Sequence, residues 1–151
     1  MANLMEDELF RAFTTYAAIV IVKMLLMGPL TAYYRITRGS FANIEDVARK
    51  SADEQKKLLR THPDVERVRR CHLNDLENIV PFLGIALLYT LTGPELSSAL
   101  LHFRVFAGSR ILHTISYVCA LPQPCRSVGY FAGFIVTSSM AYRVLSTVLF
   151  L

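Results

Sequence analysis

The sequence predicts an all-α integral membrane protein in which four long helices form one bundle, a single membrane domain over residues 1–151. Three observations predict this fold. Hydrophobic residues make up 53% of the chain and charged residues 19%, whereas an average soluble domain carries roughly 25% charge. Four apolar stretches reach the length of about 20 residues that a helix needs to cross a bilayer. Of the 16 Lys and Arg residues, 10 fall between Arg35 and Arg70, as in a membrane protein with one basic loop.

The four helices are predicted at about residues 10–36, 66–91, 96–120 and 126–149. Their apolar runs are long, uninterrupted and rich in Leu and Ala, which disfavours strands. Turn residues separate the later helices: Thr92-Gly93-Pro94 follows the second, and Pro122-Gln123-Pro124 follows the third. Pro29 and Pro81 fall inside predicted helices, where a membrane protein tolerates them because neighbouring helices satisfy the freed carbonyl groups.

A polar segment at about residues 38–65 connects the first two helices. Because Lys and Arg in short loops mark the cytoplasmic side, we expect this loop in the cytosol. The acidic start, Glu6-Asp7-Glu8, then lies on the non-cytosolic side, and four crossings return the C-terminus to that side. The placement of the basic residues therefore indicates a lipid bilayer, and not a nucleic acid, as partner. The three cysteines form no CxxC pair, so we expect no metal site.

Each of the last three predicted helices carries a stripe of polar residues near its cytosolic end. An ionisable side chain at the bilayer centre costs about 2.5–3.5 kcal/mol, so a cluster of them indicates function. The stripes can meet at one depth and bind a small polyanionic ligand that also carries an amine, with Arg for carboxylates and Glu77 for the ammonium. The alternative is that they only tie helices together. We expect such a structural role for Lys23 and Arg104, which would pair with Asp75 or with a neighbouring subunit. The stripes are Arg70, Asn74 and Glu77; Arg110, His113 and Tyr117; and Arg126, Ser127 and Tyr130.

One long run resembles the signature of the MAPEG family, the membrane-associated proteins of eicosanoid and glutathione metabolism. The run is Val65-Glu66-Arg67-Val68-Arg69-Arg70-Cys71-His72-Leu73-Asn74-Asp75-Leu76-Glu77-Asn78-Ile79-Val80-Pro81-Phe82. Within the family, Leu73 and the run from Glu77 to Val80 resemble the type 1 branch of the microsomal glutathione transferases. By contrast, Arg126-Ser127-Val128 resembles the prostaglandin E synthase branch.

The resemblance implies a homotrimer in the endoplasmic reticulum membrane, and also in the mitochondrial outer membrane. It implies that glutathione, the co-substrate, binds between neighbouring subunits near the cytosolic face, with Arg38 reaching in from the adjacent subunit. Val47 stands where type 1 enzymes carry a cysteine whose modification raises activity, so we do not expect that activation here. The implied glutathione contacts are Arg38, Arg70, His72, Asn74, Glu77, Arg110, His113, Tyr117, Arg126, Ser127 and Tyr130.

The predicted reaction joins the glutathione thiolate to hydrophobic electrophiles in the membrane, together with reduction of lipid hydroperoxides. We assign the catalytic roles to Arg126, which stabilises the thiolate by its charge, and to Ser127, which donates a hydrogen bond to the sulfur. One alternative is a glutathione-dependent prostaglandin E synthase. A second is a non-catalytic scaffold or anionic-lipid-binding protein, which explains the basic loop but leaves the polar stripes without a purpose.

Overall fold

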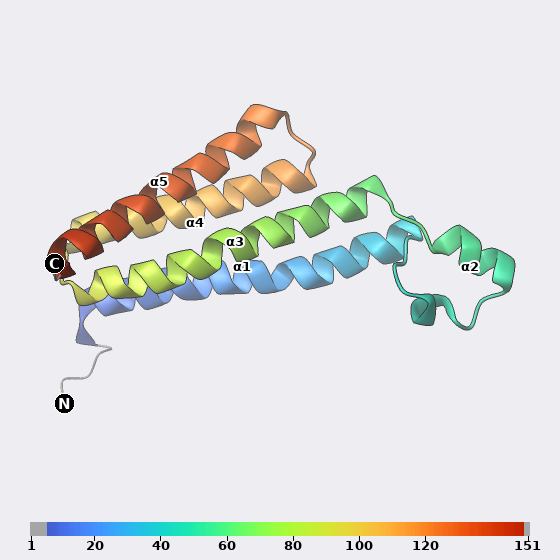
Figure 1. The fold of residues 1–151 in the computed structure, drawn as a ribbon, viewed down its shortest axis with the longest axis horizontal. Coiled ribbons are helices and arrows are strands. Elements are labelled where there is room, and N and C mark those ends of the chain that lie inside the picture. Colours follow the sequence, from blue (N-terminus) through green and yellow to red (C-terminus); the bar gives the residue numbers. More distant parts are fainter. Residues whose placement is uncertain (1–5, 150–151) are drawn as a thin grey trace.

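The computed structural model describes residues 6–149 and confirms the all-α prediction. Figure 1 shows long helices lying side by side, with both ends of the chain at one end of the molecule and α2 at the other. Over residues 6–149 the elements are α1 (Glu8–Arg38), the 3-10 helix η2 (Ile44–Val47), α2 (Ala52–Leu58), α3 (Pro63–Leu91), α4 (Leu96–Val118) and α5 (Gln123–Val148).

Capping residues fix where these helices begin. The Asp7 carboxylate accepts hydrogen bonds from two backbone N–H groups of the first turn of α1, at 2.7 and 3.2 Å, which satisfies donors that a helix otherwise leaves free. Helix α3 begins three residues earlier than expected because Pro63 suits a first helical turn. The ring of His62 caps it by accepting from the backbone N–H of Asp64, at 3.2 Å. Helix α5 likewise begins at Gln123 and not at 126.

The segment between α1 and α3, expected as a plain loop, contains the two short helices η2 and α2. A capping box starts α2: the Ser51 hydroxyl accepts from the Glu54 backbone N–H, and the Glu54 carboxylate accepts from that of Ser51. Those hydrogen bonds from Ser51 hold the pKa of Glu54 below its usual value. The segment closes on itself, because the Phe41 backbone N–H donates to the Leu58 carbonyl at 2.9 Å.

Aromatic side chains from α3 and α4 fill the centre of the bundle. The rings of Phe82 and Phe106 stack with centroids 3.6 Å apart, and Phe103 meets Phe82 edge-on at 6.3 Å. All three are buried, together with Val20 of α1 and Met140 of α5. The core therefore joins all four long helices, and it holds them in register around the polar residues described below.

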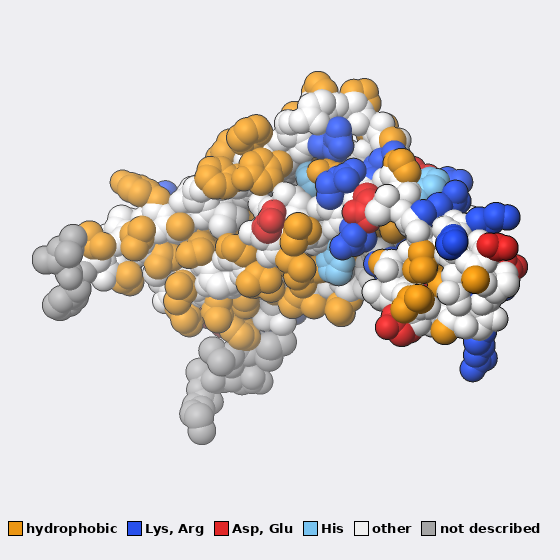
Figure 2. Space-filling model, turned by 45° about the vertical axis from the view of Figure 1, so that its right-hand side comes forward, with side chains coloured by type: hydrophobic (Ala, Val, Ile, Leu, Met, Phe, Trp, Pro, Cys, Tyr) orange, Lys and Arg blue, Asp and Glu red, His pale blue; other side chains and the backbone are white. Residues whose placement is uncertain are grey.

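The outer surface of the bundle is apolar, as expected for a protein in a bilayer. Figure 2 shows hydrophobic side chains over the long helices, whereas Lys and Arg gather toward the α2 end. By length and composition, α1 and α5 are candidate membrane spans. Helices α3 and α4 are not apolar enough in composition to count as candidate spans, but they also expose large apolar side chains. Examples are Leu25 and Leu26 on α1, Leu76 and Val80 on α3, Ile111 and Ile115 on α4, and Phe134 and Ile135 on α5.

Candidate functional site

A polar cavity of about 180 Å³ lies between α3, α4 and α5, towards the end of α4 that leads into α5. Each of the three stripes predicted from sequence contributes at least one residue to it: Asn74 from the first, His113 and Tyr117 from the second, and Arg126, Ser127 and Tyr130 from the third. The side chains that line the cavity are Asn74, His113, Tyr117, Gln123, Arg126, Ser127, Tyr130 and Phe131.

A close contact between α4 and α5 shapes one wall of the cavity. A Cβ atom added at Gly129 would lie 3.0 Å from the Cβ of His113 and 3.0 Å from the carbonyl oxygen of Ser109. Only glycine therefore lets the α5 backbone approach α4 this closely. Arg126 lies three residues before Gly129 and Tyr130 directly follows it, so this contact sets their distance from His113.

Arg126 lines the cavity and contacts two of the other lining side chains. Its Nη2 donates a hydrogen bond to the Gln123 side-chain oxygen at 2.9 Å. Its guanidinium carbon lies 5.0 Å from the centre of the Tyr117 ring, close enough for a cation–π interaction. The Tyr117 ring in turn lies 4.8 Å from that of His113. The guanidinium is thus held in place from two sides.

Arg110 lies behind the cavity, fully buried, and reaches it through Asn74. Its Nη2 donates to the Asn74 side-chain oxygen at 2.8 Å, and its Nε lies 3.7 Å from Oδ1 of Asp75. The other oxygen of Asp75 pairs with Lys23 of α1, which is one of the two kinds of partner expected for Lys23. Arg110 is therefore part of a buried charged group that spans α1, α3 and α4.

Several polar atoms at the site are buried without a hydrogen-bond partner within the described residues. They are Nε of Arg126, Nδ1 of His113, and Nε and Nη1 of Arg110. Buried polar groups are almost always hydrogen-bonded, so unpartnered ones call for an explanation, and an absent ligand is one. Guanidinium donors pair best with carboxylates, which matches an anionic ligand with carboxylate groups such as glutathione.

Glu77 was expected to be buried among the stripes, and this expectation was wrong. It is exposed and lines a separate hollow of about 310 Å³ whose wall includes Tyr130. Glu77 follows Asn74 by three residues, so it lies about 60° away from Asn74 around the helix axis. The rotation carries the carboxylate out of the polar cavity, although Tyr130 borders both spaces.

His72 and Arg70 also lie outside the polar cavity. The two-residue step from His72 to Asn74 turns the helix by about 200°, so the two side chains point in opposite directions. His72 lines a hollow of about 630 Å³ on the α1–α3 side, next to Arg35 and Arg69. Arg70 is exposed.

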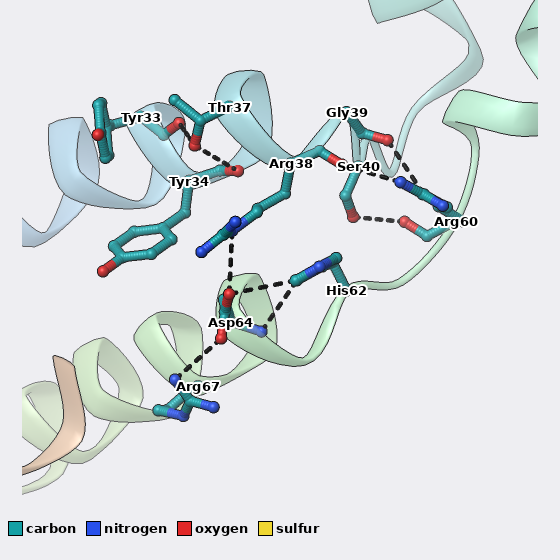
Figure 3. Close-up of polar contacts among 10 residues, drawn as sticks. All are labelled: Tyr33, Tyr34, Thr37, Arg38, Gly39, Ser40, Arg60, His62, Asp64 and Arg67. Carbon is teal, nitrogen blue, oxygen red and sulfur yellow. Dashed lines mark hydrogen bonds and ion pairs between the residues drawn. The ribbon is translucent and has the colours of Figure 1, made fainter. Parts of the chain in front are cut away.

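Arg38, expected to reach an adjacent subunit, is engaged within its own chain. Figure 3 shows its guanidinium turned toward Asp64, with Nε 3.0 Å from a carboxylate oxygen. The second oxygen of Asp64 accepts from Arg67 at 3.0 Å. Arg60 donates to the Arg38 carbonyl at 3.1 Å, which holds the end of α1. The Arg38 side chain is still 49% exposed.

Sequence reasoning missed Gln123 and Phe131 as cavity residues. Gln123 was assigned to the turn between two prolines, where helical spacing offers no guide. The available signal was its position three residues before Arg126, a spacing at which helical side chains meet. Phe131 was indistinguishable from the lipid-facing residues around it.

The comparisons with known proteins show the family of this chain. The family model described as "MAPEG family" matches residues 13–146. The chain is 57% identical to human "Microsomal glutathione S-transferase 1" and 58% identical to the pig protein of that name, covering 100% of this chain and 98% of each relative. It is 35% identical to bovine "Prostaglandin E synthase", over 94% of this chain and 91% of that relative. The chain belongs to the MAPEG family.

Proposed function

We propose that this protein is a glutathione S-transferase that joins the glutathione thiolate to hydrophobic electrophiles in the membrane. The observation that carries the proposal is 57% identity across the whole chain to human microsomal glutathione S-transferase 1. The buried unpartnered polar atoms of His113 and Arg126 at the cavity agree with it, because glutathione supplies two carboxylates and a sulfur as hydrogen-bonding groups.

Arg126 activates the sulfur in this proposal. A cysteine-type thiol has a pKa of about 8.5, so little thiolate exists near neutral pH. A guanidinium beside the sulfur stabilises the anion more than the thiol and so lowers the thiol pKa. Arg126 suits this role because Gln123 and Tyr117 hold its guanidinium while its Nε has no partner among the described residues. Ser127 lines the same cavity and donates a hydrogen bond to the sulfur.

The remaining site residues hold glutathione in place. Asn74 takes a carboxylate, and Arg110 acts on it from behind through its hydrogen bond to Asn74. Glu77 receives the ammonium group at the border near Tyr130, and His113, Tyr117 and Tyr130 form the walls. Arg38, Arg70 and His72 lie away from this cavity, so they contribute to the cavity of a neighbouring subunit. A homotrimer is the assembly that we propose for this arrangement.

The chemistry needs no metal. In conjugation, the thiolate sulfur forms a bond to the electrophilic carbon, and the leaving group departs with its electron pair, as chloride does from a chlorinated nitrobenzene. In peroxide reduction, two glutathione molecules supply two electrons and two protons, which yields the disulfide, a lipid alcohol and water. Both reactions use the thiolate that Arg126 stabilises. The electrophile and the lipid hydroperoxide both arrive from the bilayer.

The membrane arrangement follows from the charge pattern. We propose that all four long helices cross the bilayer, with the segment 39–62 in the cytosol and both termini on the opposite side. The protein then resides in the endoplasmic reticulum membrane, with the mitochondrial outer membrane as a second location. In this arrangement the polar cavity opens toward cytosolic glutathione.

A binding and activity assay on the purified, detergent-solubilised protein tests the function. We expect the protein to bind glutathione and to conjugate a chlorinated nitrobenzene. Prostaglandin isomerisation, measured beside it, tests the synthase alternative, which Arg126-Ser127-Val128 favours. Isomerisation without conjugation would replace the proposal with that alternative, and absence of glutathione binding would refute both.

A further inference from the structure

A buried charged group lies directly behind the polar cavity and does not line it. It consists of Lys23 from α1, Asp75 from α3 and Arg110 from α4. The side chains of Asp75 and Arg110 are fully buried, and that of Lys23 is 13% exposed. Asn74, the neighbour of Asp75, joins this group to the cavity through its hydrogen bond to Arg110.

The carboxylate of Asp75 is shared unequally between the two cations. Its Oδ2 accepts a hydrogen bond from Nζ of Lys23 and forms an ion pair with it. Its Oδ1 has no hydrogen bond and lies 3.7 Å from Nε of Arg110, which is too long for a hydrogen bond. Arg110 donates only to the neutral amide of Asn74. Lys23 therefore holds the carboxylate, and the charge of Arg110 is poorly compensated.

The sum of charges in this group is positive. Lys23 and Arg110 contribute two positive charges and Asp75 one negative charge, so one positive charge remains behind the cavity. Because the effective dielectric constant inside a protein is far below that of water, this charge acts across several ångströms.

We propose that Lys23 is a positioning residue that sets the positive charge of the cavity by keeping Asp75 away from Arg110. The inference rests on the proposed function, since the charge matters only if an anionic ligand binds. Lys23 itself touches neither the cavity nor its ligand. It acts through Asp75, from a helix that contributes no side chain to the cavity.

Two variants of Lys23 distinguish a charge-setting role from a role in helix cohesion alone. In Lys23→Met, the carboxylate of Asp75 pairs with Arg110, and the charge behind the cavity falls from +1 to zero. We expect the dissociation constant of glutathione to rise roughly tenfold, the size of effect that one charge about 12 Å away has at an effective dielectric constant of about 20. The double variant Lys23→Met/Asp75→Asn leaves Arg110 as the only charge, so affinity should return to within about twofold of the wild type.

Calorimetric titration of glutathione into the full-length, detergent-solubilised protein tests the inference. Lys23→Arg keeps the charge and should bind as the wild type does. Arg104→Met is the matched control, because it removes another cation from a long helix, one that donates to the Tyr16 hydroxyl at 3.1 Å and lies outside the group. It should leave affinity unchanged.

Each result decides the question. Weak binding by Lys23→Met that the added Asp75→Asn change restores supports the inference. Unchanged binding by Lys23→Met, or a double variant that is folded by circular dichroism and binds as weakly as Lys23→Met, overturns it and leaves the proposed function intact. If Lys23→Met does not fold, wild-type affinity in the folded double variant supports the inference and weak binding overturns it. A wild type that does not bind glutathione overturns the proposed function and this inference together.

Discussion

Replacing Gly129 with alanine puts one methyl group into the contact that holds α5 against α4. The added Cβ would lie 3.0 Å from both the Cβ of His113 and the carbonyl oxygen of Ser109. Neither atom can rotate away, so α5 must move outward by a few tenths of an ångström. Overpacking of this kind costs about 1–3 kcal/mol. The same substitution also stabilises the helix by about 1 kcal/mol through its higher helix propensity. The cost of the close contact is therefore best measured against a Gly→Ala change at a glycine with open space around it.

Gly108 on α4 supplies that control, because a Cβ added there meets no atom within 4 Å. Both variants gain the same propensity, so the difference between them isolates the contact. We expect Gly129→Ala to unfold about 4–8 °C below Gly108→Ala for a difference of about 2 kcal/mol. Conjugation should also slow, roughly threefold to tenfold, because Arg126 and Tyr130 move with α5.

Thermal unfolding in detergent, followed by circular dichroism, and the rate of conjugation are the two measurements. Gly133→Ala should show an intermediate loss of stability. The atom it meets, Oγ of Ser109 at 2.9 Å, can rotate away, but only by giving up its hydrogen bond to the Phe106 carbonyl, 2.7 Å long. Equal melting temperatures for Gly129→Ala and Gly108→Ala would refute the close-packing argument.

Three further predictions concern the site and its orientation. Arg126→Leu should lower the thiolate fraction of bound glutathione roughly tenfold, measured by ultraviolet absorbance near 240 nm, and Arg126→Lys should keep part of it; normal absorbance and turnover in the Leu variant would move the role to Ser127 or Arg110. Glu77→Gln should weaken glutathione binding roughly tenfold, measured by calorimetry, because the variant loses a charged hydrogen bond. The control Glu95→Gln, in the α3–α4 connection, should bind as the wild type does. If Glu77→Gln binds as tightly as the wild type, Glu77 is assigned to helix cohesion. Protease added outside sealed microsomes should cut within residues 39–62, and cutting only after permeabilisation would reverse the orientation.

Helical periodicity explains how much of the site was predictable. Residues three, four and seven apart lie on one face of a helix, so the stripe of Arg110, His113 and Tyr117 could be placed from spacing alone. The need of Lys23 for a partner was predictable because an isolated charge inside a membrane helix is costly. The sequence left open whether that partner is Asp75 or a residue of a neighbouring subunit, and the structure shows Asp75.

The expected contacts that lie outside this cavity were chosen from their motif and not from their angle around the helix. His72 lies in the same conserved-looking run as Asn74, yet two helical residues separate their directions by about 200°. Glu77 deviates by a smaller angle and reaches only the border of the site. Contacts made by Arg38 depend on how the segment after it folds back toward Asp64, which no periodic pattern describes. Helix α2 was not predicted, although the sequence contained a signal for it. Ser51 and Glu54 have the spacing of a capping box, which marks the start of a helix.

The same close contacts that build the cavity also account for its charge. Gly129 brings α5 against α4, which places Arg126 beside the wall formed by His113 and Tyr117. Asn74 joins α3 to Arg110, and Asp75, next to Asn74, ties α3 to α1 through Lys23. Two cations, Lys23 and Arg110, thus share one carboxylate inside a bundle whose outer surface is apolar. An unbalanced buried charge destabilises a protein unless a counter-charge reaches it. Such an arrangement suits a protein whose anionic ligand supplies the missing negative charge, so that ligand binding and electrostatic balance become one event.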